Sequence, residues 1–189
     1  MIGEFRVQHV DRVLIAINNF NYGRFLPYCI SSAFKQTYFN VEVVVIDDGS
    51  TDQSGDVLSK QCTIHPSLMV QRKENAGQLS AFNAIGDFLE GIDWVFFLDA
   101  DDFFSINYVE SVLRNCPNNV DIIYCDERIV GEDDSIFQYP DCNTGDMVTV
   151  SLVPQSRYLT HALCRVIMKP TSGIVIRSSK LKELLPIPF

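Results

Sequence analysis

The chain has 189 residues, of which 47% are hydrophobic and 21% are charged, and its formal net charge is -9. This length fits one hydrophobic core, and the composition excludes an intrinsically disordered protein. The negative charge argues against nucleic acid as a partner, so a substrate carrying phosphates would need a divalent cation or helix N-termini to hold it.

Apolar runs of strand length alternate with amphipathic stretches of helix length over the first two-thirds of the chain, which predicts βαβ units. The expected strands are residues 13–17, 41–46, 68–70, 94–98 and 122–124. The expected helices are residues 25–34, 79–89 and 106–116, together with one that begins after Ser50 or Thr51 and runs towards Cys62. The fold class is therefore expected to be α/β, with a mostly parallel central sheet flanked by helices.

Several local features refine this expectation. Ser50 or Thr51 is expected to cap the second helix, with Asp52 near the positive end of its dipole. Residues 75–77 are expected to form a tight turn. Beyond Asp126 the pattern predicts a mixed second half, with an antiparallel pair around Ile129 and Phe137, a helix near 158–166 and a strand at 174–176.

The sequence also bears on the location of the protein. Residues 1–10 lack the apolar core of a signal peptide, and no apolar run reaches the roughly 18–20 residues that span a bilayer. The six cysteines contain no C-x-x-C pair and are interpreted as free thiols. We expect a protein of the cytoplasm or of the inner face of the membrane, with no transmembrane segment in this chain.

Polar clusters follow four of the expected strands. In an open parallel sheet, ligands bind at the carboxyl ends of the strands, so the four loops should form one rim. The clusters are Asn18 to Asn21, Asp47-Asp48, Arg72 to Asn75 and Asp99 to Asp102.

The Asp99-Ala100-Asp101-Asp102 cluster is the sharpest signal, because three carboxylates so close together repel one another unless a cation lies between them. Oxygen ligands select magnesium, calcium or manganese, and the first and last of these keep positions open for substrate phosphates. The alternative is a cluster that caps the following helix.

Four motifs in order resemble the family-2 glycosyltransferases with the GT-A nucleotide-sugar fold. They are Ile17-Asn18-Asn19-Phe20-Asn21-Tyr22 with Phe25-Leu26 after it, Val43 to Asp52 with its D-D-G-S-T-D ending, Asn75-Ala76-Gly77-Gln78 with Ala81 and Asn83, and the D-x-D stretch at Leu98 to Asp102. Asn18 departs from the family pattern, since many relatives carry proline there, but it still offers polar groups to a base.

The resemblance implies one GT-A domain over residues 1–189, with a nucleotide-binding half at about 1–110 and an acceptor-side half at about 111–189. Asp48 would accept from a uracil-like N–H, Asp47 would support the loop, and Asp99 would approach the ribose. The implied metal ion, Mn²⁺ or Mg²⁺, would be held by Asp99, Asp101 and Asp102. The implied nucleotide-binding residues are Asn18, Phe20, Asp48, Asn75, Gln78, Asp99, Ala100 and Asp101.

The implied activity is transfer of a sugar from a nucleotide-diphosphate donor, favoured as a UDP type, to a hydroxyl of a saccharide or lipid-linked acceptor. Inversion at the sugar, synthesis of cell-surface polysaccharide or glycoconjugate, and a homodimer are expected with it. The family's general base is typically an aspartate near the start of a later helix, and Thr171-Ser172-Gly173 resembles the segment before it. We expect the base beyond Phe189, with Glu132, Asp133, Asp134 and Asp141 as fallback candidates.

Three other functions were weighed. A non-catalytic nucleotide-sugar-binding domain is favoured only if the base is missing from the full-length protein. A sugar-phosphate nucleotidyltransferase usually carries a Gly-rich basic loop after strand one, where Asn18 to Arg24 holds a single glycine. A receiver-type signalling domain needs its acidic pair after strand one, where asparagines stand.

Overall fold

The computed structural model describes residues 10–117, 119–125, 129–130, 136–137, 148–150 and 171–188. Its strands are β1 (Val13–Asn19), β2 (Val41–Asp47), β3 (Met69–Arg72), β4 (Trp94–Asp99), β5 (Ile122–Tyr124), β6 (Ile129–Val130), β7 (Ile136–Phe137), β8 (Val148–Val150) and β9 (Ile174–Arg177). Its α-helices are α1 (Leu26–Phe34), α2 (Ser54–Ile64), α3 (Gln78–Ala84), α4 (Tyr108–Asn115) and α6 (Ser178–Leu184), and the 3-10 helices are η1 (Ile85–Phe88) and η2 (Thr171–Gly173).

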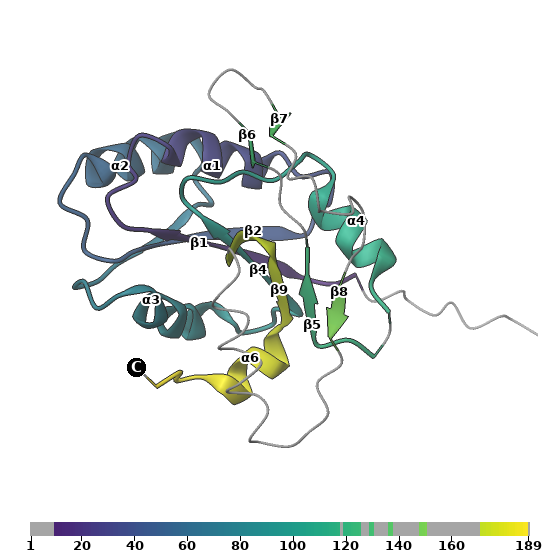
Figure 1. Ribbon diagram of the computed structural model, residues 1–189. Coiled ribbons are helices and arrows are strands. Elements are labelled where there is room, and N and C mark those ends of the chain that lie inside the picture. Colours follow the sequence, from purple (N-terminus) through teal and green to yellow (C-terminus); the bar gives the residue numbers. More distant parts are fainter. Residues whose placement is uncertain are drawn as a thin grey trace, which may run out of the picture.

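Seven strands form one sheet in the order β3-β2-β1-β4-β9-β5-β8 (Figure 1). Strands β1 to β4 pair in parallel, whereas β9 runs antiparallel to both β4 and β5, and β8 runs antiparallel to β5. Strand β5 therefore points in the same direction as β1 to β4. The expected α/β class, with a mostly parallel sheet and a mixed second half, is confirmed, as is the antiparallel pair β6 and β7.

The sheet is buried on both faces. In β1, Val13, Ile15 and Ile17 pack into one core, whereas Leu14 and Ala16 pack into a second core on the opposite face. Helices α1 and α2 cover the first face, and α3 and α6 cover the second (Figure 1). A parallel strand covered on both faces must be apolar at successive positions, which explains the continuous apolar runs of the sequence.

The expected helix at 79–89 is divided in the structure. Helix α3 ends at Ala84, and η1 continues the chain from Ile85 to Phe88. Gly86 lies in this second part, where glycine weakens an α-helix, and a Cβ there would lie 3.3 Å from Leu185 Cδ1. The glycine thus allows the segment after α6 to pack closely against η1. The helix expected near 158–166 lies outside the described residues.

The start of α2 differs from the expectation. The helix begins at Ser54, so neither Ser50 nor Thr51 caps it. Asp52 instead accepts bonds from the backbone N–H of Ser54 at 2.9 Å and from that of Gly23 at 3.0 Å. The Ser50 hydroxyl is engaged elsewhere, because it donates to Asp47 and accepts from Asn19 Nδ2 and from the backbone N–H of Asn21.

Replacing Asp52 with Ala should lower the free energy of unfolding at neutral pH by about 0.5–2 kcal/mol, because both oxygen acceptors are lost. Burial acts to raise the pKa of Asp52, but hydrogen bonds from Ser54 and Gly23 outweigh it and lower the pKa below the ordinary 3.8. The carboxylate therefore contributes stability above that pH, and the contribution is lost as the pH falls through the folded-state pKa. Urea unfolding of both proteins should show the difference shrinking in acid, and an unchanged difference would contradict this role.

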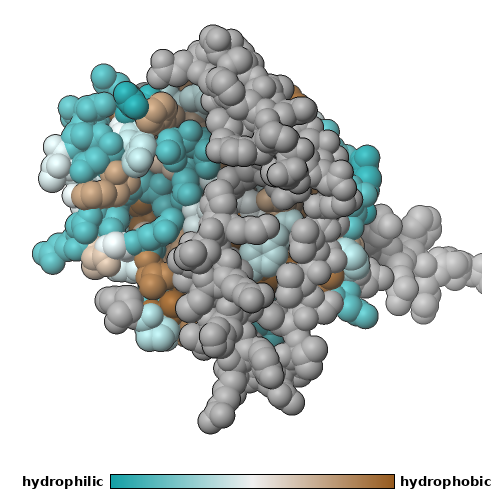
Figure 2. Space-filling model, in the orientation of Figure 1, coloured by the Kyte–Doolittle hydropathy of each residue, from teal (hydrophilic) through white to brown (hydrophobic). Residues whose placement is uncertain are grey.

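The described surface is mostly hydrophilic at the upper left of Figure 2, where α2 lies, and it shows hydrophobic residues at the lower left, near α3. Within the described residues, no helix combines the length and the apolar character needed to cross a membrane. The described cysteines are free thiols, as expected, namely Cys29, Cys62, Cys116 and Cys125.

Candidate functional site

A cleft of about 470 Å³ opens at the carboxyl ends of β1, β2 and β4. Strand β1 has β2 on one side and β4 on the other, so the cleft lies where the strand order reverses, the usual ligand position in such sheets. Its volume is typical of small-molecule sites. The residues that line it are Asn18, Asn19, Phe20, Tyr22, Asp48, Asn75, Gly77, Gln78, Ala81, Asp99, Ala100 and Asp101.

All of the residues expected to bind a nucleotide lie on this cleft: Asn18, Phe20, Asp48, Asn75, Gln78, Asp99, Ala100 and Asp101. Sequence reasoning did not assign Asn19, Tyr22, Gly77 or Ala81 to the site. The signal was available for all four residues, because they stand inside the motifs. Their part in binding, like that of the expected residues, stays a prediction.

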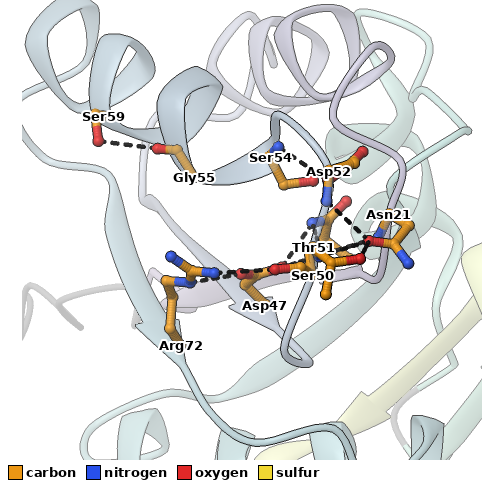
Figure 3. A network of polar contacts seen from close by, with 10 residues as sticks. Asn21, Asp47, Ser50, Thr51, Asp52, Ser54, Gly55, Ser59 and Arg72 are labelled. Atoms are coloured by element: carbon orange, nitrogen blue, oxygen red, sulfur yellow. Dashed lines mark hydrogen bonds and ion pairs between the residues drawn. The ribbon is translucent and has the colours of Figure 1, made fainter.

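The rim loops after β1 and β2 are tied together by Asn21 (Figure 3). Asn21 has a φ of 61°, a left-handed conformation that asparagine tolerates better than most residues. The side-chain oxygen of Asn21 accepts from the backbone N–H of Thr51 at 2.8 Å and of Asp52 at 3.3 Å. The backbone N–H of Asn21 donates to Ser50 Oγ at 2.8 Å. These bonds hold both loops in one arrangement around the cleft.

Asp47 is fully buried beneath this rim and supports the loop, as expected. Its carboxylate accepts from Asn19 Nδ2 at 2.8 Å and from the Ser50 hydroxyl, and its second oxygen lies 2.8 Å from Arg72 Nε (Figure 3). A buried carboxylate is stable only when it is paired and hydrogen-bonded, and Asp47 meets both conditions.

Asp48 organises the loop after β3. Its carboxylate forms an ion pair with Lys73 and accepts from the backbone N–H groups of Ala76 at 3.2 Å and Gly77 at 2.9 Å. The tight turn expected at 75–77 is wrong, because no turn forms there. The carboxylate satisfies these amides instead, which brings Asn75 and Gly77 to the cleft.

Gly49 allows the loop after β3 to pack closely against the loop after β2. It has a φ of 74°, and a Cβ built there would lie 2.7 Å from the backbone nitrogen of Asn75. Replacing Gly49 with Ala should cost about 1–2 kcal/mol through the left-handed backbone alone, and more because Asn75 must move. Gly91→Ala is the matched control, since Gly91 also has a positive φ, 69°, but a Cβ there would meet only the flexible end of the Arg12 side chain. Equal losses of unfolding free energy in the two variants would contradict the importance of the contact.

The aspartate loop, Asp99 to Asp102, is held by hydroxyl groups from η2. The Asp99 carboxylate accepts from Thr171 Oγ1, and its backbone N–H donates to Ser172 Oγ at 2.9 Å. The Asp102 carboxylate accepts from the same Ser172 hydroxyl. In the described part of the chain, no Lys or Arg forms an ion pair with Asp99, Asp101 or Asp102. No basic side chain in the described part of the chain offsets the charge of this loop, whereas Asp47 and Asp48 are each paired with a cation.

The surroundings of this loop disfavour charge. Burial raises the pKa of Asp99 against the opposing hydrogen bond from Thr171, and the charges of Asp102 and Asp101 raise it further. Burial likewise raises the pKa of Asp102. Burial first, and then the three carboxylates, raise the pKa of the Cys29 thiol well above its usual range, so this neighbour remains neutral. A divalent cation would relieve such an accumulation of negative charge.

The three carboxylates do not converge as the sequence suggested. Among the residues described, no three His, Cys, Asp or Glu side chains are placed together as a metal site. Asp99 and Asp101 line the cleft, but Asp102 does not, because its carboxylate is bound by Ser172. Two carboxylates still suit Mg²⁺ or Mn²⁺, which take one or two protein carboxylates together with substrate phosphates and waters. The donor chemistry therefore fits such an ion at Asp99 and Asp101.

The side-chain amide of Asn18, which lines the cleft, has no hydrogen-bond partner within the described part of the chain. Both the nitrogen and the oxygen of its side-chain amide are buried, and neither has a partner among the described residues. Buried amides are nearly always hydrogen-bonded in folded proteins, so a donor and an acceptor on a bound molecule are the natural partners. The fallback candidates for the general base, Glu132, Asp133, Asp134 and Asp141, lie outside the described residues.

Comparison with known proteins adds independent findings. Residues 14–185 match the model of the family described as Glycosyl transferase family 2. An uncharacterised glycosyltransferase of Nostoc sp. is 31% identical over 179 residues, covering 93% of this chain and 54% of that protein. The hyaluronan synthase of Pasteurella multocida is 28% identical over 165 residues, covering 84% of this chain and 17% of that protein. The chain thus spans about half of the first relative and less of the second.

Solved structures share the fold. Staphylococcus aureus TarS (residues 1–349) in complex with UDP-GlcNAc matches with a TM-score of 0.61 and 21% identity, over 91% of this chain and 47% of that one. The mannosyltransferase PcManGT of Pyrobaculum calidifontis, in complex with GDP-Man and Mn²⁺, matches with a TM-score of 0.54 and 23% identity, over 64% of this chain and 37% of that one. Identities this low support the fold alone.

Proposed function

Because this chain belongs to glycosyl transferase family 2, we propose that its cleft binds a nucleotide-diphosphate sugar, of UDP type, and that the protein transfers the sugar to an acceptor hydroxyl. The observation that carries the proposal is the gathering of Asn18, Asp48, Asp99 and Asp101 on one cleft at the carboxyl ends of the strands.

The base is proposed to lie against Asn18 and Asp48. The Asn18 amide has a donor and an acceptor to offer, and Asp48 Oδ2 accepts only one hydrogen bond in the described structure, from Gly77. A uracil ring presents an N–H between two carbonyl groups, which matches one carboxylate acceptor beside amide groups. The exposed ring of Phe20, at the rim of the cleft, supplies an apolar face for the base.

The diphosphate is proposed to lie near Asp99 and Asp101, which would hold a Mn²⁺ or Mg²⁺ ion. When bound, this ion offsets the charge that develops on the departing diphosphate. The solved structure of PcManGT with GDP-Man and Mn²⁺ supports this assignment by analogy of fold. The two carboxylates also orient the donor, since Asp99 is fixed by Thr171 and Ser172.

In the proposed reaction, the acceptor oxygen forms a bond to the anomeric carbon while the bond from that carbon to the phosphate oxygen breaks. The electron pair leaves with the nucleoside diphosphate, the acceptor proton passes to a general base, and the configuration inverts. We propose a saccharide or lipid-linked acceptor, reached from the cytoplasm, in polysaccharide or glycoconjugate synthesis. Residues 1–110 would bind the donor and residues 111–189 would face the acceptor.

Isothermal titration of this chain with UDP tests the proposal. UDP should bind in the presence of Mn²⁺ and much more weakly with EDTA, because the ion offsets repulsion between the diphosphate and the aspartate loop. The same titration with GDP and with dTDP shows which nucleotide base the cleft binds most tightly. Absence of binding by all three nucleotides, with either Mn²⁺ or Mg²⁺, would overturn the assignment.

A further inference from the structure

Thr171 and Ser172 reach the aspartate loop from far away in the sequence. They belong to η2, which leads directly into β9, and β9 pairs antiparallel with β4 in a register that sets Phe96 opposite Val175. Continuing this register places η2 beside the end of β4, where the aspartate loop begins. Both residues are buried, with exposed fractions of 4% and 6%.

Each hydroxyl joins two parts of the site. Thr171 Oγ1 donates to the Asp99 carboxylate and accepts from Gln78 Nε2 at 3.3 Å, so it links the first residue of α3 to the aspartate loop. Ser172 Oγ accepts from the Asp99 backbone N–H and donates to the Asp102 carboxylate. The first hydroxyl orients a carboxylate that lines the cleft, and the second holds Asp102 away from it.

The neutral character of these donors is important. A Lys or Arg in the same position would orient Asp99 equally well but would cancel the charge that attracts a cation. A hydroxyl donates one hydrogen bond and adds no charge. This arrangement contrasts with Asp47 and Asp48, which are paired with Arg72 and Lys73 on the same edge of the sheet.

We propose that Thr171 and Ser172 are positioning residues for the donor site: they select Asp99 and Asp101 as the carboxylates presented to the cation and keep Asp102 out of that set. The inference rests on the proposed function, and it makes the second half of the chain a part of the donor site. It assigns a role to two hydroxyl groups whose residues do not line the cleft themselves.

Thr171→Val tests the first hydroxyl, because valine keeps the shape and removes the hydrogen bonds. The affinity for UDP in the presence of Mn²⁺ should fall by about 10-fold or more, the usual effect of losing a partner of a metal ligand. Thr171→Ser, which keeps the hydroxyl, should restore it to within about threefold. Mn²⁺ binding followed by electron paramagnetic resonance, without nucleotide, should weaken in the same order.

A double-mutant cycle separates positioning from general damage. If Thr171 acts through Asp99, then Thr171→Val should cost little further affinity in an Asp99→Asn background. Ser172→Ala, measured alone and combined with Asp102→Asn, provides the same cycle for the second hydroxyl. This second cycle tests the inference if the Thr171→Val protein does not fold. Additive losses in both cycles would overturn the inference.

The outcomes distinguish the two proposals. If the unmodified chain fails to bind UDP with Mn²⁺, the proposed function fails. If it binds, and Thr171→Val and Ser172→Ala bind equally well, only the positioning role fails.

Discussion

Replacing Asp101 with Asn should weaken UDP binding in the presence of Mn²⁺ by about 100-fold or more, because losing even an indirect partner of a metal ligand costs about 10–100-fold. Asp101 lines the cleft, and its carboxylate has no hydrogen bond or ion pair within the described part of the chain. It is thus the carboxylate of the loop most available to a cation. Asparagine keeps the size of the side chain and removes its charge.

The readout is isothermal titration with and without Mn²⁺. UDP binding without metal should not weaken and should become slightly stronger, since the variant removes a charge that repels the diphosphate. Glu90→Gln is the matched control, because Glu90 is an exposed acid that does not line the cleft. An Asp101→Asn protein that keeps its Mn²⁺-dependent affinity would show that the ion is held elsewhere.

Replacing Asp47 with Ala should produce the largest loss of stability, about 3 kcal/mol or more, since each buried donor left without a partner costs about 1–3 kcal/mol. The Ser50 hydroxyl would lose its acceptor, and Asn19 Nδ2 would keep only Ser50 Oγ, in a region where both residues are buried. Arg72 contributes less to this loss, because its side chain is 55% exposed and water can replace the carboxylate.

Urea unfolding measures the effect. Asp47→Asn should lose less than Asp47→Ala, because an amide oxygen can still accept from Asn19 and Ser50. Glu90→Ala, at an exposed position, should stay within about 0.5 kcal/mol of the unmodified protein. A loss in Asp47→Ala no larger than that of Glu90→Ala would show that the rim loops do not depend on this carboxylate.

These two aspartates illustrate two uses of negative charge on one sheet edge. Asp47 is neutralised by Arg72 and builds the loop, so its replacement is a stability effect. Asp101 has no cationic partner among the described residues, so its replacement is a binding effect. The two variants should therefore separate, with Asp101→Asn as stable as the unmodified chain and Asp47→Ala unstable.

Much of the fold and the cleft was predictable from local sequence. Continuous apolar runs specify strands buried on both faces, and the polar residues that follow them must gather at one edge when those strands run parallel. For this reason Asn18, Asp48 and Asp99 were assigned to one site, and the structure places them there. The amphipathic spacing likewise located α1, α2 and α4 to within a few residues.

What only the tertiary structure decided were the contacts between distant segments. The insertion of β9 between β4 and β5 depends on pairing between residues as distant in the sequence as Trp94 and Arg177, and no local pattern carries that register. This strand pairing brings Ser172 to Asp102, whose carboxylate it binds. The three carboxylates of the aspartate loop look equivalent in the sequence, but only Asp99 and Asp101 line the cleft. Ser50 was expected to cap α2 but bonds Asp47, because a hydroxyl binds whichever acceptor folding brings to it. The periodicity of apolar residues determines which faces of the helices and strands are buried. The hydrogen-bond partners of the polar side chains depend on which distant segments come together when the chain folds.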